Sequence, residues 1–204
     1  MAWDTARTQQ LLLTAAVEEF AEHGPEGARI ARIATRAGVN KERIYQYFGN
    51  KEQLFAAVLT AEMGKLAASV PLTPQHAEDL ADYAGRCYDY HVANPHFTRL
   101  LAWEGLQRGA GPGFGSGEPL AAESERLAHY AEKVGAIAAA QRAEALTDEL
   151  DPGRLMFAVI ALVTSWIMLP QLTRLLFAPP NSPQPASDRE AIMLLARKMT
   201  TRSS

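Results

Sequence analysis

The amino-acid sequence predicts an all-α protein of about nine helices. Apolar residues recur at helical spacing along almost the whole chain, and no run of alternating β-branched residues is bounded by turn dipeptides. With 204 residues, of which 48% are hydrophobic and 21% charged, the chain is long and apolar enough to bury a sizeable core. We divide it into an N-terminal domain of three helices over residues 1–50 and a larger helical domain over residues 51–204.

Capping side chains, glycines and prolines give the expected limits of each helix. Asn40 is a suitable N-cap, Asn50 and Gln53 have the spacing of a capping box, and Asp151-Pro152 reads as the N-cap and first residue of a helix. The expected helices cover residues 4–23, 30–37, 41–47, 51–68, 78–93, 95–106, 119–146, 152–177 and 188–199. Residues 109–117 are glycine-rich and predict a loop, and residues 179–185 predict an extended linker.

Several features argue for a cytoplasmic protein with no membrane partner. Cys87 is the single cysteine, so no intrachain disulfide can form. The N-terminus lacks the basic and then apolar layout of a secretory signal. The most apolar stretch, Leu155–Leu169, is shorter than the roughly 20 residues that a membrane-spanning helix needs.

The helix expected over residues 152–177 is apolar on nearly every face as far as Pro170. A helix of this kind must be covered all round, and a chain of this size has few helices to cover it. A second copy of the chain would complete the cover, so we expect a homodimer. The alternative is a central helix that is sheathed entirely by its own chain.

Basic residues concentrate between Gly27 and Lys51, where Glu42 is the single acid. The six basic residues are Arg29, Arg32, Arg36, Lys41, Arg43 and Lys51. Because the formal net charge of the whole chain is −3, the remainder of the chain is acidic. A short basic block on an acidic protein suggests a local site for a polyanion, although a solvated helical surface has the same pattern.

Two short helical segments in this block have the pattern of a helix-turn-helix. Gly38 lies between them and permits a turn with positive φ, while Ile33, Ala34 and Ile44 are expected to pack inward. In such a motif the second helix enters the major groove of DNA, with its N-terminal residues at the base edges. The residues left to face outward are Lys41, Glu42, Arg43, Tyr45 and Gln46.

The literal residues of this region are more specific than the pattern. They are Phe20-Ala21-Glu22-His23-Gly24, Ile33-Ala34, Ala37-Gly38-Val39-Asn40-Lys41, Ile44-Tyr45-Gln46-Tyr47-Phe48 and Lys51-Glu52-Gln53-Leu54. In these residues the chain closely resembles the TetR family of bacterial transcription regulators, without a gap from about Thr8 to Leu59. The resemblance implies a helical dimer whose N-terminal helices bind operator DNA. Its C-terminal part would bind a small molecule and dimerise, usually through the last two helices.

The motif and the resemblance together predict ten DNA-binding positions. They are Thr8, Arg29, Asn40, Lys41, Glu42, Arg43, Tyr45, Gln46, Tyr47 and Lys51. Two of them depart from the family pattern. Arg29 replaces the usual Ser or Thr before the second helix, which exchanges a capping side chain for a cation suited to a phosphate. Glu42 replaces a residue that is often small, and it either accepts from cytosine N4 or braces Arg43; we favour the brace.

The larger domain offers candidates for an effector site. Aromatic and apolar side chains between helices belong more often to the hydrophobic core than to a ligand-binding site. Ligand-binding sites in helical bundles are nevertheless lined by such residues. The seven candidates are Tyr83, Cys87, Phe97, Leu101, Trp103, Tyr130 and Trp166, which suggest a flat apolar or aromatic ligand. Glu104, His129 and Gln141 would supply a polar contact.

These observations predict a ligand-responsive transcriptional regulator, most simply a repressor, that binds a palindromic operator as a dimer and is released by a small apolar or aromatic effector. One alternative is a small-molecule-binding module of the same fold without operator function. Another is a small helical enzyme that uses Cys87, His91 and Glu104. Cys87 and His91 are four residues apart, but no second pair completes a metal site. Because the sequence contains no catalytic constellation, we expect neither an enzyme nor a cofactor.

Overall fold

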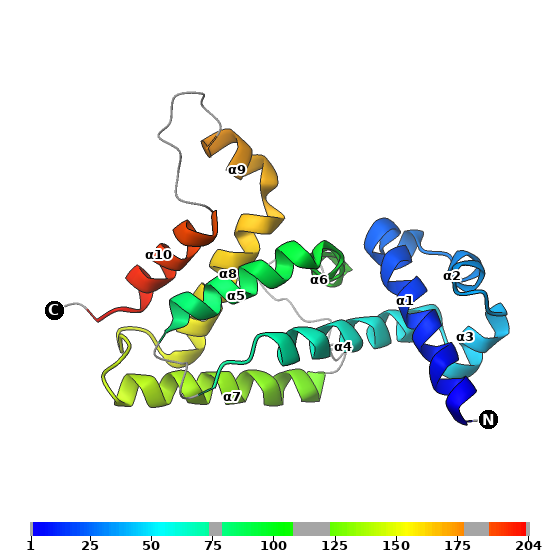
Figure 1. The fold of residues 1–204 in the computed structure, drawn as a ribbon, viewed down its shortest axis with the longest axis horizontal. Helices are drawn as coiled ribbons and strands as arrows, with labels where there is room; N and C mark the ends of the chain where they lie inside the picture. Colours follow the sequence, from blue (N-terminus) through cyan, green and yellow to red (C-terminus); the bar gives the residue numbers. More distant parts are fainter. Residues whose placement is uncertain (1, 74–78, 108–122, 178–187, 203–204) are drawn as a thin grey trace. The chain divides into compact units, whose positions relative to one another are not determined.

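The computed structural model describes residues 2–73, 79–107, 123–177 and 188–202, with side chains from Thr5 onward. The described residues form helices and no strand, which confirms the all-α prediction (Figure 1). The helices are α1 (Ala2–Gly27), α2 (Ile30–Ala37), α3 (Lys41–Phe48), α4 (Lys51–Ser69), α5 (Leu80–Ala93), α6 (Pro95–Gln107), α7 (Glu123–Arg142), α8 (Pro152–Met168), α9 (Pro170–Phe177) and α10 (Asp188–Thr200). The loop expected over residues 109–117 and the linker expected over 179–185 lie outside the described residues.

The helices pack into two compact units. The first comprises Met1–Lys65 and Pro95–Glu123, and the second comprises Leu66–Asn94 and Ser124–Ser204. Helix α4 starts in the first unit, and its last residues belong to the second. The boundary at residue 50 that the sequence suggested stays a prediction.

The core of the first unit is built on one face of α1. Leu12, Ala16 and Phe20 lie four residues apart on this face, and all three are completely buried. Ile33 of α2 and Ile44 of α3 are buried in the same cluster, as are residues of α4 and Leu100 of α6. The short helices therefore depend on α1 for their burial, because an eight-residue helix is not stable alone.

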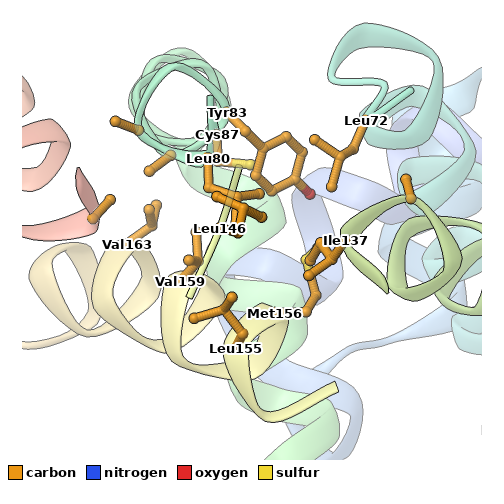
Figure 2. Packing of buried hydrophobic residues seen from close by; sticks show 14 of the residues in the cluster. Leu72, Leu80, Tyr83, Cys87, Ile137, Leu146, Leu155, Met156, Val159 and Val163 are labelled. Atoms are coloured by element: carbon orange, nitrogen blue, oxygen red, sulfur yellow. The ribbon is translucent and has the colours of Figure 1, made fainter. Parts of the chain in front are cut away.

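The core of the second unit lies between α5, α7, α8 and α10. Figure 2 shows its central side chains, with Leu80 and Tyr83 from α5, Ile137 from α7 and Val159 from α8 pointing toward one another. Ile192 of α10 is completely buried in the same cluster. The Tyr83 hydroxyl points away from Leu80, toward the side where Leu72 and Ile137 lie (Figure 2).

The helix expected over residues 152–177 is in fact two helices, and this prediction was wrong. The helix α8 ends at Met168, Leu169 has φ −117° and ψ 53°, and α9 starts at Pro170 with a bend of 80°. Proline lacks an N–H group, and its ring disfavours helical backbone in the residue before it. The count of ten instead of nine among the described helices follows from this break. Among the described residues, no single helix is long and apolar enough to cross a membrane. The bent pair of α8 and α9 reaches that length and composition only when the two helices are counted together.

Helix ends differ from expectation in two further places. Helix α1 begins at Ala2, two residues before the predicted start at Asp4; its first helical run is interrupted at Gly24, which has φ 66° and ψ 171°, as the predicted end at residue 23 requires. Helix α7 ends at Arg142, because the Gln141 side chain donates to the carbonyl groups of Thr147 (2.7 Å) and Leu150 (2.9 Å) and closes the following turn. The predicted start of this helix at Pro119 lies outside the described residues.

Candidate nucleic-acid interface

The turn between α2 and α3 has the geometry of a helix-turn-helix. Gly38 has φ 66° and ψ 30°, and its N–H group donates to the Thr35 carbonyl at 3.1 Å. The Val39 N–H group donates to the Ala34 carbonyl at 3.0 Å, which completes a Schellman ending. Asn40 then caps α3 as predicted, since its Oδ1 accepts from the Glu42 N–H group. The turn fixes the direction of α3 relative to α2.

Helix α3 presents a polar face to solvent. Ile44 is completely buried beneath it, whereas Tyr45 is 52% exposed. The other exposed side chains of the helix are Lys41, Glu42, Arg43 and Gln46, and Tyr47 is half-buried. A shallow groove beside this face is lined by Ala31, Ala34, Thr35, Gly38, Val39, Asn40 and Lys41. The five residues of this helix that were expected to face outward, Lys41, Glu42, Arg43, Tyr45 and Gln46, are therefore all exposed to solvent.

Arg43 is held by two residues of its own helix. Its Nη1 donates to Gln46 Oε1 at 3.2 Å and to the Tyr47 hydroxyl at 3.4 Å, and its guanidinium lies 6.0 Å from the centroid of the Tyr47 ring. The preferred interpretation of Glu42 as the brace for Arg43 was wrong. Neighbouring residues on a helix point in different directions, whereas residues three and four apart share a face. The brace comes from Gln46 and Tyr47.

A buried carboxylate, which sequence analysis missed, caps α2 from another helix. Arg29 occupies the N-cap position without a side-chain cap, and its backbone N–H group donates to Glu19 Oε1 at 2.9 Å. Arg32 Nε donates to the same oxygen at 2.7 Å, and Glu19 is completely buried. Burial alone would raise the pKa of Glu19, but the hydrogen bonds from Arg32 and Arg29 outweigh it and hold the pKa below its usual value. Glu19 therefore connects the start of α2 to α1 through these two hydrogen bonds.

The start of α4 carries the predicted capping box. The Gln53 N–H group donates to Asn50 Oδ1 at 2.7 Å, and the Asn50 N–H group donates to Gln53 Oε1 at 3.1 Å. Lys51, in the first turn of α4, places its Nζ 3.5 Å from the Glu26 carbonyl. Thr8 is half-buried on α1, and the Arg29 side chain is exposed. The contacts of these positions with DNA stay a prediction.

The seven candidate effector residues are divided between the two units. Phe97, Leu101 and Trp103 lie on α6 in the first unit. There the Trp103 ring covers Gly24, where an added Cβ would lie 2.9 Å from the ring. The second unit holds Tyr83, Cys87, Tyr130 and Trp166.

Within the second unit, Tyr83 and Cys87 are buried in the core and Tyr130 is 42% exposed. Trp166 stacks on Phe177 with ring centroids 5.4 Å apart. The assignment of all seven to one ligand site stays a prediction.

No metal centre is visible among the described side chains. No group of three or more His, Cys, Asp or Glu residues in the described ranges has the arrangement to hold an ion. His91 is buried, and burial lowers its pKa, while burial raises the pKa of the Cys87 thiol. The pair that sequence analysis considered for metal binding is part of a buried helix face.

The fold and the exposed α3 face define a helix-turn-helix protein with a separate helical second unit. Two families match the chain: "Bacterial regulatory proteins, tetR family" over residues 12–58, and "Tetracyclin repressor-like, C-terminal domain" over residues 79–198. The chain belongs to the TetR family of bacterial transcriptional regulators.

Individual relatives agree with this assignment. The HTH-type transcriptional repressor SCO4008 of Streptomyces coelicolor is 42% identical over 175 residues, which are 86% of each chain. The HTH-type transcriptional repressor NicS of Pseudomonas putida is 38% identical over half of each chain.

Solved structures agree as well. The crystal structure of a transcriptional regulator described as SCO4942, also from Streptomyces coelicolor, has a TM-score of 0.77 at 31% identity, covering 96% of this chain and 99% of that one. FadR of Bacillus subtilis, solved in complex with stearoyl-CoA, shares the fold with a TM-score of 0.64 at 20% identity, covering 92% and 96%.

Proposed function

We propose that the protein is a repressor that binds a palindromic operator as a dimer and leaves it when a small effector binds the second unit. The observation that carries the proposal is the exposed polar face of α3, which stands on a packed helix-turn-helix. The names of the two curated relatives, both repressors, support the direction of regulation. Since bacterial DNA lies in the cytoplasm, that is where the protein would act.

On DNA, we assign different tasks to the basic residues. Lys41 and Lys51 lie at the starts of α3 and α4, where an ammonium and free N–H groups suit phosphate oxygens. Arg43 is exposed on α3, and Gln46 and Tyr47 hold its side chain in place. An oriented guanidinium can donate two hydrogen bonds to the edge of a base. Glu42, without a role as a brace, is left as a candidate to accept from cytosine N4.

The proposed dimer would use the apolar side chains that α8 and α10 leave exposed. Phe157 of α8 is 73% exposed, and Leu194 and Leu195 of α10 are 53% and 43% exposed. A symmetric pair of subunits would present two α3 helices to half-sites about 34–36 Å apart. Because α4 belongs to both units, an effector that shifts the second unit would alter this separation and disfavour binding.

Electrophoretic shift and fluorescence anisotropy with an operator selected from genomic fragments would test the proposal. We expect dimeric binding whose affinity falls steeply with salt, with a slope near −0.9 for each phosphate neutralised. The Lys51→Ala variant should bind operator and random DNA more weakly by the same factor. The Arg43→Ala variant should lose about 1–3 kcal/mol at one base pair of each half-site and little on random DNA.

Arg36→Ala is the control variant, because Arg36 forms an ion pair with Glu18 at 3.1 Å and is not among the expected DNA contacts. A salt-independent affinity would contradict the proposal. Equal losses on operator and random DNA for Arg43→Ala would contradict the assignment of Arg43 to a base edge.

A further inference from the structure

Lys133 is a buried lysine in the core of the second unit. It lies on α7 and is 4% exposed. Its Nζ donates to the Tyr83 hydroxyl at 2.7 Å and lies 4.9 Å from the centroid of the Tyr83 ring. The guanidinium of Arg86 lies 5.9 Å from the same ring. Two cations thus surround one buried aromatic side chain.

Among the described residues, the charge of Arg86 is compensated by a carboxylate and that of Lys133 is not. Arg86 Nε lies 2.7 Å from Asp82 Oδ2, and its Nη1 donates to the Pro71 carbonyl at 3.1 Å. In the part of the chain that the structure describes, the ammonium of Lys133 has the Tyr83 hydroxyl as its hydrogen-bond partner and no carboxylate within ion-pair distance. Buried charges are normally paired, because an isolated ammonium loses its hydration.

The groups nearest to Lys133 do not provide the missing negative charge. Burial raises the pKa of Tyr83 well above its usual value, so its hydroxyl keeps its proton. Burial also raises the pKa of the Cys87 thiol, which outweighs the opposing effects of Tyr83, Lys133 and Arg86. Both groups are therefore neutral at pH 7. Burial lowers the pKa of Lys133, because the loss of hydration disfavours its charged form, and a bound anion would oppose this effect.

We propose that Lys133 and Tyr83 bind the carboxylate of an apolar or aromatic acid, which is the effector class of this protein. The inference rests on the proposed function for the existence of an effector, and it specifies the chemistry of that effector. The Lys133 ammonium has three N–H groups, of which one is used by Tyr83, and the Tyr83 hydroxyl has a proton of its own to donate. A carboxylate would accept from both residues and compensate the buried charge.

The surroundings select an acid with an apolar body. Leu72, Ile137 and Met156 are buried in the same cluster as Tyr83, and Figure 2 shows Leu72 and Ile137 on the side to which the Tyr83 hydroxyl points. A neutral ligand would leave the ammonium uncompensated, and a cationic ligand would add a like charge. In an anion attached to an aliphatic or aromatic group, the negative charge would pair with the ammonium and the apolar group would pack against the apolar side chains.

Calorimetric titration of the full-length protein with matched ligand pairs tests the inference. The probes are benzoate, phenylacetate and decanoate, each compared with its primary amide. We expect at least one acid to bind ten times more tightly than its amide. In Lys133→Met this preference should disappear, and in Tyr83→Phe it should be reduced but retained. Arg142→Met, an exposed position on the same helix, should keep the full preference.

Thermal melting of the ligand-free variants separates a binding role from a structural one. Removing an uncompensated buried charge while keeping the length of the side chain should leave the melting temperature of Lys133→Met equal to or above that of the wild type. A lower melting temperature, or the absence of any acid preference across the three pairs, would overturn the inference. Since neither measurement contains DNA, a failure to bind an operator would contradict the proposed function and leave this result unaffected.

Discussion

At residue 19, a carboxylate on α1 supplies the cap that α2 lacks in its own sequence. The Arg29 side chain has no acceptor for the N–H groups in the first turn of α2. The backbone N–H group of Arg29 donates to Glu19 instead of to a residue of its own helix. The partners lie 10 and 13 residues away along the chain. A sequence pattern identifies a capping side chain only when it lies within about three residues of the N–H group that it accepts from. Asn40, Asn50 and Asp151 were therefore predicted correctly, and Glu19 was not.

The Glu19→Gln variant should lower the unfolding free energy at pH 7 by about 1–3 kcal/mol, because a charged acceptor of buried hydrogen bonds is lost. The folded-state pKa of Glu19 is depressed, so its stabilisation is present above the unfolded value near 4.5 and is lost as the pH falls through the folded value. Urea unfolding between pH 7 and pH 3 should therefore show a smaller loss of stability on acidification in Glu19→Gln than in the wild type.

Glu18→Gln provides the control for this measurement. Glu18 is the neighbouring residue and forms an ion pair with Arg36, but its side chain is 62% exposed. Exposed pairs contribute little, so the variant should follow the wild-type pH profile. Parallel profiles for Glu19→Gln and the wild type would show that the Glu19 carboxylate is not an important acceptor.

At the scale of the helices, Gly24 interrupts α1 and allows α6 to approach it closely. Its φ of 66° and ψ of 171° fall in a region that residues other than glycine avoid, and the Trp103 ring of α6 closes over it. The sequence predicted a first helix over residues 4–23, which ends immediately before Gly24. The sequence analysis assigned Trp103 to a ligand site. Helical spacing shows that the Trp103 side chain faces inward, but it does not show that the ring covers a glycine 79 positions earlier in the chain.

Gly24→Ala should destabilise the protein by about 2–4 kcal/mol, since a backbone strain of about 1–3 kcal/mol is joined by a steric conflict with Trp103. Gly38→Ala is the matched control. Gly38 has the same φ of 66°, but nothing lies within 4 Å of an added Cβ, so a loss of about 1–2 kcal/mol is expected. Chemical denaturation of both variants gives the comparison, and equal losses would mean that the contact with Trp103 is unimportant.

The break between α8 and α9 shows where the helix prediction failed. The stretch from Leu155 to Phe177 is so apolar that its periodicity continues through Pro170, and the sequence analysis followed the periodicity. The local geometry of proline prevailed, and α9 leaves at 80° with none of its residues buried. Hydrophobic pattern identifies helices, whereas backbone chemistry decides where one helix becomes two.

At the scale of the whole molecule, the apolar side chains left in solvent are the strongest sign of a second copy. Phe157→Glu should convert a dimer into a monomer, because it would place a carboxylate on the exposed face of α8 that we assign to the interface. Analytical ultracentrifugation at micromolar concentration measures the result, and operator affinity should fall with the loss of the second half-site contact.

Leu127→Glu is the control for the dimer, since Leu127 on α7 is 65% exposed and lies outside the proposed interface. A dimeric Phe157→Glu variant would show that α8 does not form the interface. The sequence predicted the need for a partner from composition alone, but it could not identify the exposed side chains, because the faces of α8 that its own chain covers depend on α5 and α10.

The cap that Glu19 supplies also bears on how the first unit folds. Because α2 receives its first hydrogen-bond acceptor from α1, and both short helices bury their apolar residues against it, a peptide of residues 28–50 would lose its acceptor and its core together. We therefore expect that α3 does not form ahead of α1. The backbone amides of α3 should exchange with solvent only when the whole unit opens, so that α2 and α3 fold with α1 in a single cooperative event.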